Sequence, residues 1–163
     1  MSYLTQKTIK DKVSFHGIAL HSGLNVNICI KPAEPNFGIV FKRTDVVNNN
    51  LVYPNFMDVT NTSLNTTVEN EFGVKVSTIE HLMGALFGLG IDNALIEIDN
   101  EEVPILDGSA KEFIDKIIKI GFKLSQTPIK IIKINKIIEY VDGERFIRMQ
   151  PSTLSLDIDF ELK

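Results

Sequence analysis

The sequence predicts an α+β fold, in which strands and helices come mostly from separate parts of the chain. Two observations support this. Strand-like segments fill most of the first 70 residues, and two helix patterns, at 77–88 and 109–121, follow with one strand between them. With 163 residues, the chain is long enough for one hydrophobic core and part of a second.

The clearest strand covers residues 24–31, where apolar and polar side chains alternate. The apolar positions are Leu24, Val26, Ile28 and Ile30. Because successive side chains of a strand point to opposite faces, this segment predicts a half-buried strand. A turn-forming segment ends it, and residues 38–43 form the next predicted strand. Residues 61–68 are extended but rich in Thr, which indicates either a polar strand facing solvent or the lining of a site.

The first predicted helix, at 77–88, begins with Ser77 as N-cap and Glu80 three residues later, the pattern of a capping box. Its apolar stripe consists of Ile79, Leu82, Met83 and Leu86. The opposite side carries mostly small residues, namely His81, Gly84, Ala85 and Gly88. A side of this kind allows a backbone segment or a ligand to approach closely.

The second predicted helix follows a buried strand at 94–99 and a loop at 101–107. Ser109 and Glu112 form another capping-box pattern, and Gly121 ends the helix. The apolar stripe of this helix consists of Phe113, Ile114, Ile117 and Ile118.

The remaining residues predict a sheet without a helix to cover it. Residues 125–128 are predicted as a linker, and strand patterns follow at 129–134, 137–141, 145–149 and 153–162, with a hairpin turn at Asp142-Gly143. We therefore expect a first domain at 1–124 and an incomplete second domain, strands only, at 129–163 of a truncated two-domain protein. The alternative is that this sheet packs on the first domain or on a second copy of the chain.

Composition excludes several classes of protein. A net charge of −4 provides no basic surface for nucleic acid. The single cysteine, Cys29, excludes an internal disulfide and fits a reducing compartment. The N-terminal residues have no signal-peptide pattern, and no segment approaches the roughly 20 apolar residues of a membrane span. We expect a soluble cytoplasmic protein.

Glu80 and His81 are the strongest candidates for chemistry. An imidazole can bind zinc while an adjacent carboxylate takes a proton from water, as in metal hydrolases. The competing interpretation is that Glu80 only caps the helix and His81 is a surface residue. A catalytic zinc has about three protein ligands. The other two histidines, His16 and His21, lie near predicted turns and provide no second metal-binding pair.

Five stretches of the chain, in order and over nearly its whole length, resemble the N-terminal part of the UDP-3-O-acyl-N-acetylglucosamine deacetylases, the zinc amidases of bacterial lipid A synthesis. They are Gly17–Gly23 (GIALHSG), Phe41–Asp45 (FKRTD), Ser77–Leu82 (STIEHL), Gly88–Asn93 (GLGIDN) and Pro104–Ala110 (PILDGSA). The resemblance implies two similar domains with the active site between them. Each would be a two-layer sandwich, a small mixed sheet with two helices on one face, and here the second copy would be incomplete.

The resemblance also implies roles for single residues. His81 would be the first zinc ligand, and Glu80 would be the general base that activates water to remove the acetyl group from a UDP-linked acylated glucosamine. Leu64, Asn65 and Thr66 match a strand that borders the zinc and the substrate acyl chain, and Arg145 lies where the family has a basic residue near the diphosphate.

The family's other zinc ligands, a His-x-x-x-Asp pair, and a further catalytic histidine belong to a C-terminal part that these 163 residues lack. We therefore expect the chain alone to hold zinc weakly or not at all and to have no appreciable activity, and we expect a C-terminal half to supply the missing ligands. The alternative function is an inactive remnant that acts as a binding or interaction module. An RNA-binding module is a third hypothesis, against which the acidic composition counts.

Overall fold

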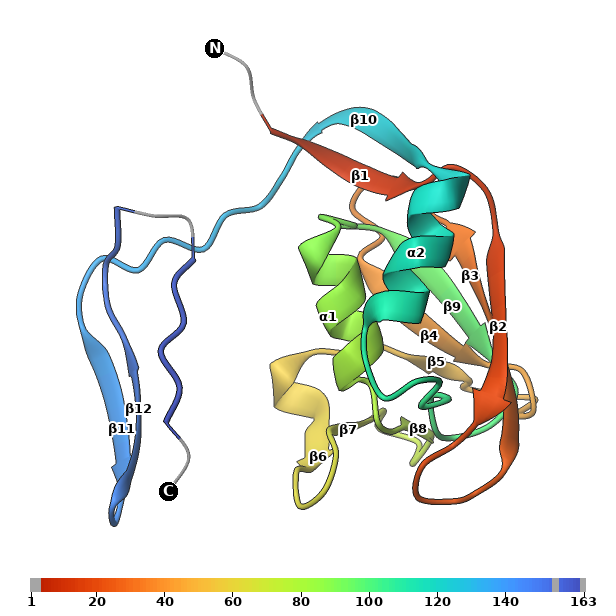
Figure 1. The fold of residues 1–163 in the computed structure, drawn as a ribbon, viewed down its shortest axis with the longest axis horizontal. Coiled ribbons are helices and arrows are strands. Elements are labelled where there is room, and N and C mark those ends of the chain that lie inside the picture. Colours follow the sequence, from red (N-terminus) through yellow and green to blue (C-terminus); the bar gives the residue numbers. More distant parts are fainter. Residues whose placement is uncertain (1–3, 154–155, 162–163) are drawn as a thin grey trace. The chain divides into compact units, whose positions relative to one another are not determined.

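The computed structural model describes residues 4–153 and 156–161 (Figure 1). The chain forms two compact units, Met1–Ile129 and Lys130–Lys163, and each is described by itself. Mixed sheets combine with two α-helices in the described part of the chain, so the predicted α+β class is confirmed. No helix in this part is long and apolar enough to span a membrane.

A five-stranded sheet forms the centre of the first unit. Its order is β2-β3-β9-β4-β5, with bounds Val13–Ile18, Asn25–Pro32, Ala94–Ile98, Ile39–Arg43 and Leu51–Val52. Strands β4 and β9 are parallel and the other neighbours are antiparallel, so the sheet is mixed, as predicted. The predicted strands at 24–31, 38–43 and 94–99 are confirmed within one or two residues at their ends.

The two faces of this sheet differ in polarity. Val26, Ile28 and Ile30 of β3 are buried on one face, as the alternation predicted, whereas Leu24 lies before the strand and is exposed. On the other face Glu97 of β9 pairs with lysines of both neighbouring strands, at 2.6 Å from Lys31 and 3.9 Å from Lys42. Only the apolar face therefore needs to be covered.

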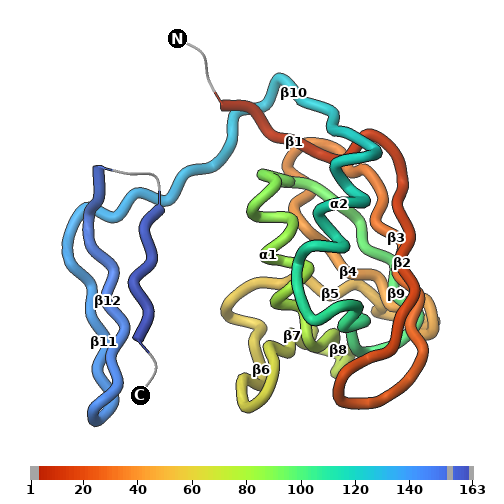
Figure 2. Tube along the Cα trace, in the orientation of Figure 1, coloured from red at the N-terminus to blue at the C-terminus, as the bar shows by residue number. Residues whose placement is uncertain are grey.

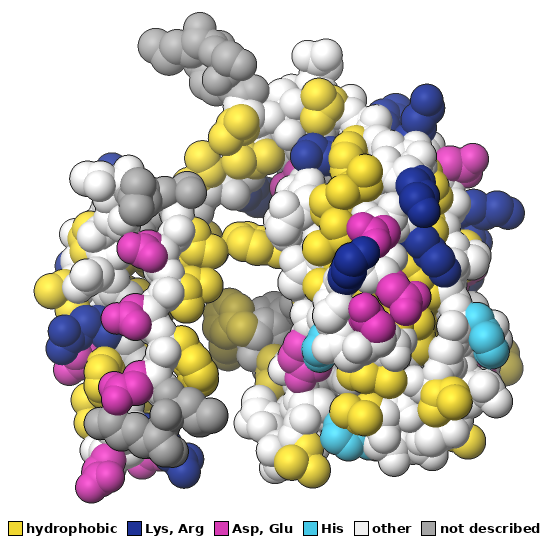
Figure 3. Space-filling model, in the orientation of Figure 1, with side chains coloured by type: hydrophobic (Ala, Val, Ile, Leu, Met, Phe, Trp, Pro, Cys, Tyr) yellow, Lys and Arg dark blue, Asp and Glu magenta, His cyan; other side chains and the backbone are white. Residues whose placement is uncertain are grey.

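Helices α1 (Glu80–Gly88) and α2 (Lys111–Ile120) lie beside each other over the sheet (Figures 1 and 2). Their buried side chains join those of β2, β3 and β9 in one core, in which the rings of Phe15 and Phe113 are 4.9 Å apart. The outer surface of α2 carries charged side chains (Figure 3). Ile117 is fully buried but its neighbour Ile118 is 52% exposed, so the stripe predicted for α2 is narrower than expected.

The prediction that one side of α1 is left free for a backbone segment or a ligand is only partly correct. Gly84 and Gly88 are exposed and His81 is half-buried, but Ala85 belongs to the core. Ala85 follows Leu82 by three residues. Because 3.6 residues make one helical turn, the two side chains lie on nearly the same face of α1. The helix ends as predicted, with Gly90 just beyond it at a φ of 66°.

Neither predicted capping box forms, because Ile79 and Ala110 occupy the N-cap positions and their side chains make no capping hydrogen bond. Ser77 instead extends toward the loop after β9, where its N–H and hydroxyl bind the carbonyl oxygen of Glu101 at 2.8 and 3.2 Å. The hydroxyl of Ser109 accepts the N–H of Lys111 at 3.0 Å.

The predicted linker at 125–128 is the second half of a strand. Strand β10 (Phe122–Pro128) pairs antiparallel with β1 (Thr5–Ile9). Gly121 has a φ of 83°, a conformation that favours glycine, and it ends α2 as predicted. The domain assignment of 1–124 and 129–163 remains a prediction.

A small antiparallel sheet completes the first unit and leads into α1. Its strands are β6 (Val59–Asn61), β7 (Thr67–Glu69) and β8 (Lys75–Val76), preceded by the 3₁₀ turn η1 (Phe56–Asp58). Residues 62–66 form a loop between β6 and β7.

In the second unit, strands β11 (Ile138–Asp142) and β12 (Arg145–Met149) form a hairpin. Gly143 takes the first turn position with a φ of 60°, so the predicted hairpin is confirmed. The strands predicted at 129–134 and 153–162 are absent from the described residues there, and 154–155 and 162 lie outside them. An alternating pattern of apolar and polar residues does not by itself produce a strand, because the backbone N–H and C=O groups of a strand also need a partner strand. That this unit is an incomplete second copy of the first remains a prediction.

Candidate active site

The first two residues of α1 carry the side chains that the sequence selected. Glu80 is exposed and His81 is half-buried. The carboxylate of Glu80 accepts a hydrogen bond from the backbone N–H of Thr66, in the 62–66 loop. Glu80 therefore does not cap its own helix, and its role as a general base remains a prediction.

The three residues expected beside the site lie in the 62–66 loop and not in a strand, which corrects the prediction. The side chain of Asn61 accepts the N–H of Ser63 at 2.9 Å, a local turn that ends β6. Asn65 Nδ2 donates to the hydroxyl of Thr78 at 3.3 Å, which brings Asn65 and Thr66 to the start of α1. Leu64 is 83% exposed on the same loop.

Thr78 has an uncommon backbone conformation immediately before α1. Its φ is 54°, and its side chain is buried. A β-branched residue rarely adopts this left-handed conformation, because the side chain crowds the backbone. Such strain persists only where the surrounding contacts enforce it. Two hydrogen bonds hold the hydroxyl, one from Asn65 and one to Glu102 at 3.0 Å.

Glu102 is buried beside Thr78, and its position in the sequence indicated only a loop. Its carboxylate accepts the backbone N–H groups of His21 at 2.8 Å and Ser22 at 2.9 Å, in addition to the Thr78 hydroxyl. Burial raises the pKa of Glu102, but these hydrogen bonds outweigh burial and hold the pKa below its ordinary value. No local pattern distinguishes this residue from an ordinary surface glutamate.

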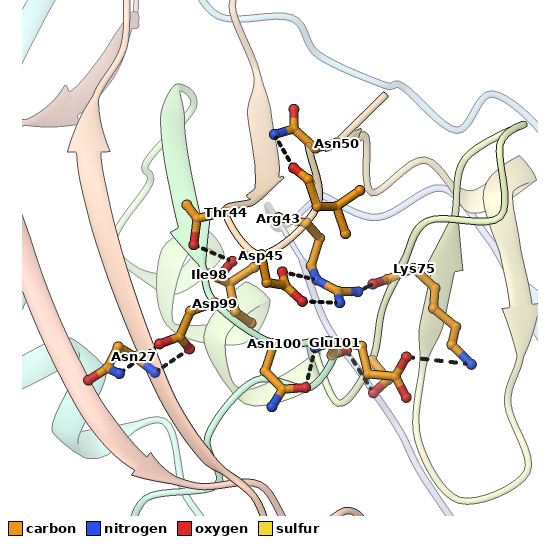
Figure 4. Close-up of polar contacts among 12 residues, drawn as sticks. Asn27, Arg43, Thr44, Asp45, Asn50, Lys75, Ile98, Asp99, Asn100 and Glu101 are labelled. Carbon is orange, nitrogen blue, oxygen red and sulfur yellow. Dashed lines mark hydrogen bonds and ion pairs between the residues drawn. The ribbon is translucent and has the colours of Figure 1, made fainter. Parts of the chain in front are cut away.

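The strand that enters α1 is held to the main sheet by Arg43 (Figure 4). The guanidinium group donates to both carboxylate oxygens of Asp45, at 2.8 and 2.6 Å, and to the carbonyl oxygen of Lys75 in β8 at 2.7 Å. Glu101 adds an ion pair with Lys75 at 3.7 Å. The hydrogen bond from Arg43 holds the pKa of Asp45 below its ordinary value. The hydrogen bonds of Arg43 hold β8, which ends at the residue before Ser77, to the main sheet.

A zinc site needs several donor groups close together. His81 contributes one imidazole at the start of α1, but residues 4–153 and 156–161 contain no group of three or more His, Cys, Asp or Glu that could hold a metal. His16 lies on β2, where Nδ1 is 2.9 Å from Oδ1 of Asn27. A catalytic zinc takes about three protein ligands, so these residues by themselves do not fit one.

Arg145, the residue expected near the diphosphate, is the first residue of β12 in the second unit, where it is exposed. Its role in binding remains a prediction, as do those of Leu64, Asn65 and Thr66.

Residues 6–163 match the model of the LpxC family, UDP-3-O-acyl N-acetylglycosamine deacetylase. Three similar curated proteins are all named UDP-3-O-acyl-N-acetylglucosamine deacetylase. The protein of Nautilia profundicola is 43% identical over 98% of this chain and 53% of its own length. Those of Shewanella violacea and Histophilus somni are each 41% identical, over 96% and 97% of this chain and 52% and 53% of their own lengths. The chain spans about half the length of these relatives.

Proposed function

Because the chain belongs to the family of UDP-3-O-acyl N-acetylglycosamine deacetylases, we propose that it forms part of the active site of such a deacetylase. The substrate would be UDP-3-O-acyl-N-acetylglucosamine, the compound in the names of the relatives. The reaction would then belong to lipid A synthesis in the cytoplasm, as expected from the sequence. One observation carries the assignment to residues. Glu80 and His81 are adjacent at the start of α1, and the carboxylate of Glu80 is oriented by Thr66 and not used as a helix cap.

Glu80 is the proposed general base. An exposed carboxylate held by a single backbone N–H keeps lone pairs for another donor. In the proposed reaction, Glu80 takes a proton from a water molecule as the water oxygen attacks the carbonyl carbon of the acetamide. The carbon–nitrogen bond then breaks, the nitrogen gains the proton that Glu80 took from the water, and the products are acetate and a free amine on the glucosamine.

His81 is the proposed zinc ligand of this chain. Since the described residues do not bring two further donors to it, the proposal requires donors from a segment outside these 163 residues. The proposal of zinc at this position therefore rests on membership of the family and on one imidazole.

The loop residues and Arg145 are the proposed substrate contacts. Leu64 presents an exposed apolar side chain two residues from Thr66, which suits contact with an acyl chain. Hydrogen bonds to Thr78 and Glu80 hold Asn65 and Thr66 of the loop close to the start of α1. Arg145 carries an exposed guanidinium group, a good partner for a diphosphate.

The test is reassembly of an active enzyme. Residues 1–163 are co-expressed with the C-terminal half of a relative, such as the Nautilia profundicola protein, and acetate release from UDP-3-O-acyl-N-acetylglucosamine is measured with added zinc. Activity should require both segments. His81→Gln should abolish it, whereas the matched control His16→Gln, an exposed histidine on β2, should not.

Equal activity of the two histidine variants would refute the role of His81. If reassembly with C-terminal halves of several relatives yields neither bound zinc nor activity, the alternative of an inactive binding or interaction module gains support.

A further inference from the structure

We propose that Glu102 is a positioning residue of the site, whose buried carboxylate sets the orientation of Glu80 through Thr78 and Asn65. The consequence for catalysis rests on the proposed function, whereas the structural coupling between Glu102 and Glu80 can be measured without any activity.

Glu102 joins segments that are far apart in the sequence. It is only 2% exposed, and its hydrogen-bond donors come from residues 24, 80 and 81 positions away in the sequence. One oxygen, Oε1, accepts both the His21 N–H and the Thr78 hydroxyl, and the other accepts the Ser22 N–H. A buried carboxylate is tolerated only when it is hydrogen-bonded in this way.

The charge of Glu102 determines the direction of the hydrogen bonds that follow. An ionised carboxylate only accepts, so the single hydroxyl proton of Thr78 points to Glu102. The hydroxyl oxygen is then left to accept from Asn65 Nδ2. This orients the side-chain amide of Asn65 so that its Oδ1 accepts from the hydroxyl of Thr67 at 3.0 Å. The residue between these two, Thr66, donates its N–H to Glu80.

The backbone of Thr78 adds a second link. Its left-handed conformation turns the chain two residues before Glu80, and a β-branched residue stays there only under constraint. The bonds to Glu102 and Asn65 are the side-chain constraints that the structure provides. Loss of the carboxylate would allow Thr78 to return to a common conformation and would move the first turn of α1.

Glutamine cannot replace Glu102 in this arrangement. Both oxygens accept from backbone N–H groups, and the amide of glutamine would place an NH₂ donor against one of them. Glu101→Gln is the matched control, because Glu101 is the adjacent residue and its ion pair with Lys75 is about half exposed to solvent, where an ion pair contributes little.

The experiment follows the amide signal of Thr66 by NMR in the 163-residue chain. In Glu102→Gln we expect the signal to shift and its hydrogen exchange to accelerate at least about tenfold, as local opening becomes easier. Glu101→Gln should leave both unchanged. Thr78→Val should reproduce the effect, Thr78→Ser should not, and Glu102→Gln combined with Thr78→Val should add nothing beyond the larger single effect.

A lowered denaturation midpoint in Glu102→Gln with an unchanged Thr66 amide would overturn the proposal, since Glu102 would then be only structural. Additive effects in the double variant would also overturn it. If Glu102→Gln does not fold, the Thr66 amide signals of Thr78→Val and Thr78→Ser are compared instead, because both variants keep the carboxylate of Glu102. An unchanged signal in Thr78→Val would then overturn the proposal.

Kinetics of the reassembled enzyme provide a second readout. Misplacement of the general base should lower kcat of Glu102→Gln by about tenfold to a hundredfold with little change in KM. A change in KM alone would contradict a role in orienting Glu80. If no combination of segments is active, the proposed function fails, but the amide measurement still decides whether Glu102 positions Glu80.

Discussion

The backbone N–H of Thr66 donates a hydrogen bond to the carboxylate of Glu80, which lies 14 residues further along the chain. This contact connects the 62–66 loop to the first turn of α1. An amide oxygen could accept the same bond, but only a carboxylate can also take up a proton at neutral pH. A mutation of Glu80 to glutamine can therefore separate the orientation of this side chain from its proposed role in proton transfer.

Glu80→Gln should keep the fold and lose the chemistry. We expect the free energy of unfolding to change by less than about 1 kcal/mol, since an acceptor for Thr66 remains. The kcat of the reassembled enzyme should fall by about 10²- to 10⁴-fold, the usual contribution of a general base. Denaturant unfolding and acetate release measure the two effects. Glu112→Gln, in the first turn of α2, is the control and should change neither. Full activity of Glu80→Gln would rule out its role as base.

Two neighbouring isoleucines of α2 test where the core lies. Ile117 is fully buried and Ile118 is 52% exposed. Ile117→Ala should lower the free energy of unfolding by about 2–5 kcal/mol, because it removes buried methyl groups and leaves a cavity. Ile118→Ala should cost less than about 1 kcal/mol. Similar losses from both variants, measured by denaturant unfolding, would mean that α2 is oriented differently.

Asp45 should make stability depend on pH. Because Arg43 lowers the pKa of Asp45 in the folded state, the stabilisation is present above the unfolded pKa of about 3.9 and is lost as the pH falls through the lower folded value. Asp45→Asn should therefore reduce stability at pH 7 and make progressively less difference below about pH 4. Unfolding curves between pH 2 and 7 would measure this. Asp115→Asn, which removes an exposed ion pair with Lys111, should cost little at pH 7.

Truncation distinguishes a linker from a strand. A chain that ends at Ile129 keeps the first unit, whereas one that ends at Gly121 loses β10 and leaves β1 without its partner. The shorter chain should be less stable by about 2 kcal/mol or more, since several backbone hydrogen bonds of roughly 1 kcal/mol each are lost. Equal denaturation midpoints would mean that β10 contributes nothing to the fold.

Zinc binding tests the limit of these 163 residues. With one imidazole ligand, the chain alone should bind zinc weakly, and His81→Gln should remove what binding there is. Calorimetric titration of the metal-free chain measures this. Turnover by the metal-loaded chain alone at the rate of a whole relative would contradict the prediction.

The sequence by itself determined the features that depend on local periodicity. Alternation in residues 24–31 predicted β3, the 3.6-residue period predicted both helices, and Gly121 predicted the end of α2. These succeed because side-chain direction and backbone preference act over one or two turns of chain. The local sequence also indicated Glu80 and His81 as candidate site residues. Short motifs indicated the family, to which the chain belongs.

Only the tertiary structure decided the features that depend on distant partners. Ser77 does not cap α1, because its N–H and hydroxyl are engaged by Glu101, 24 residues away. Residues 125–128 are a strand because β1, at the other end of the unit, pairs with them. Glu102 is buried because donors from His21, Ser22 and Thr78 converge on it. Each outcome is set by hydrogen-bond partners that the fold brings together, which a local pattern cannot contain.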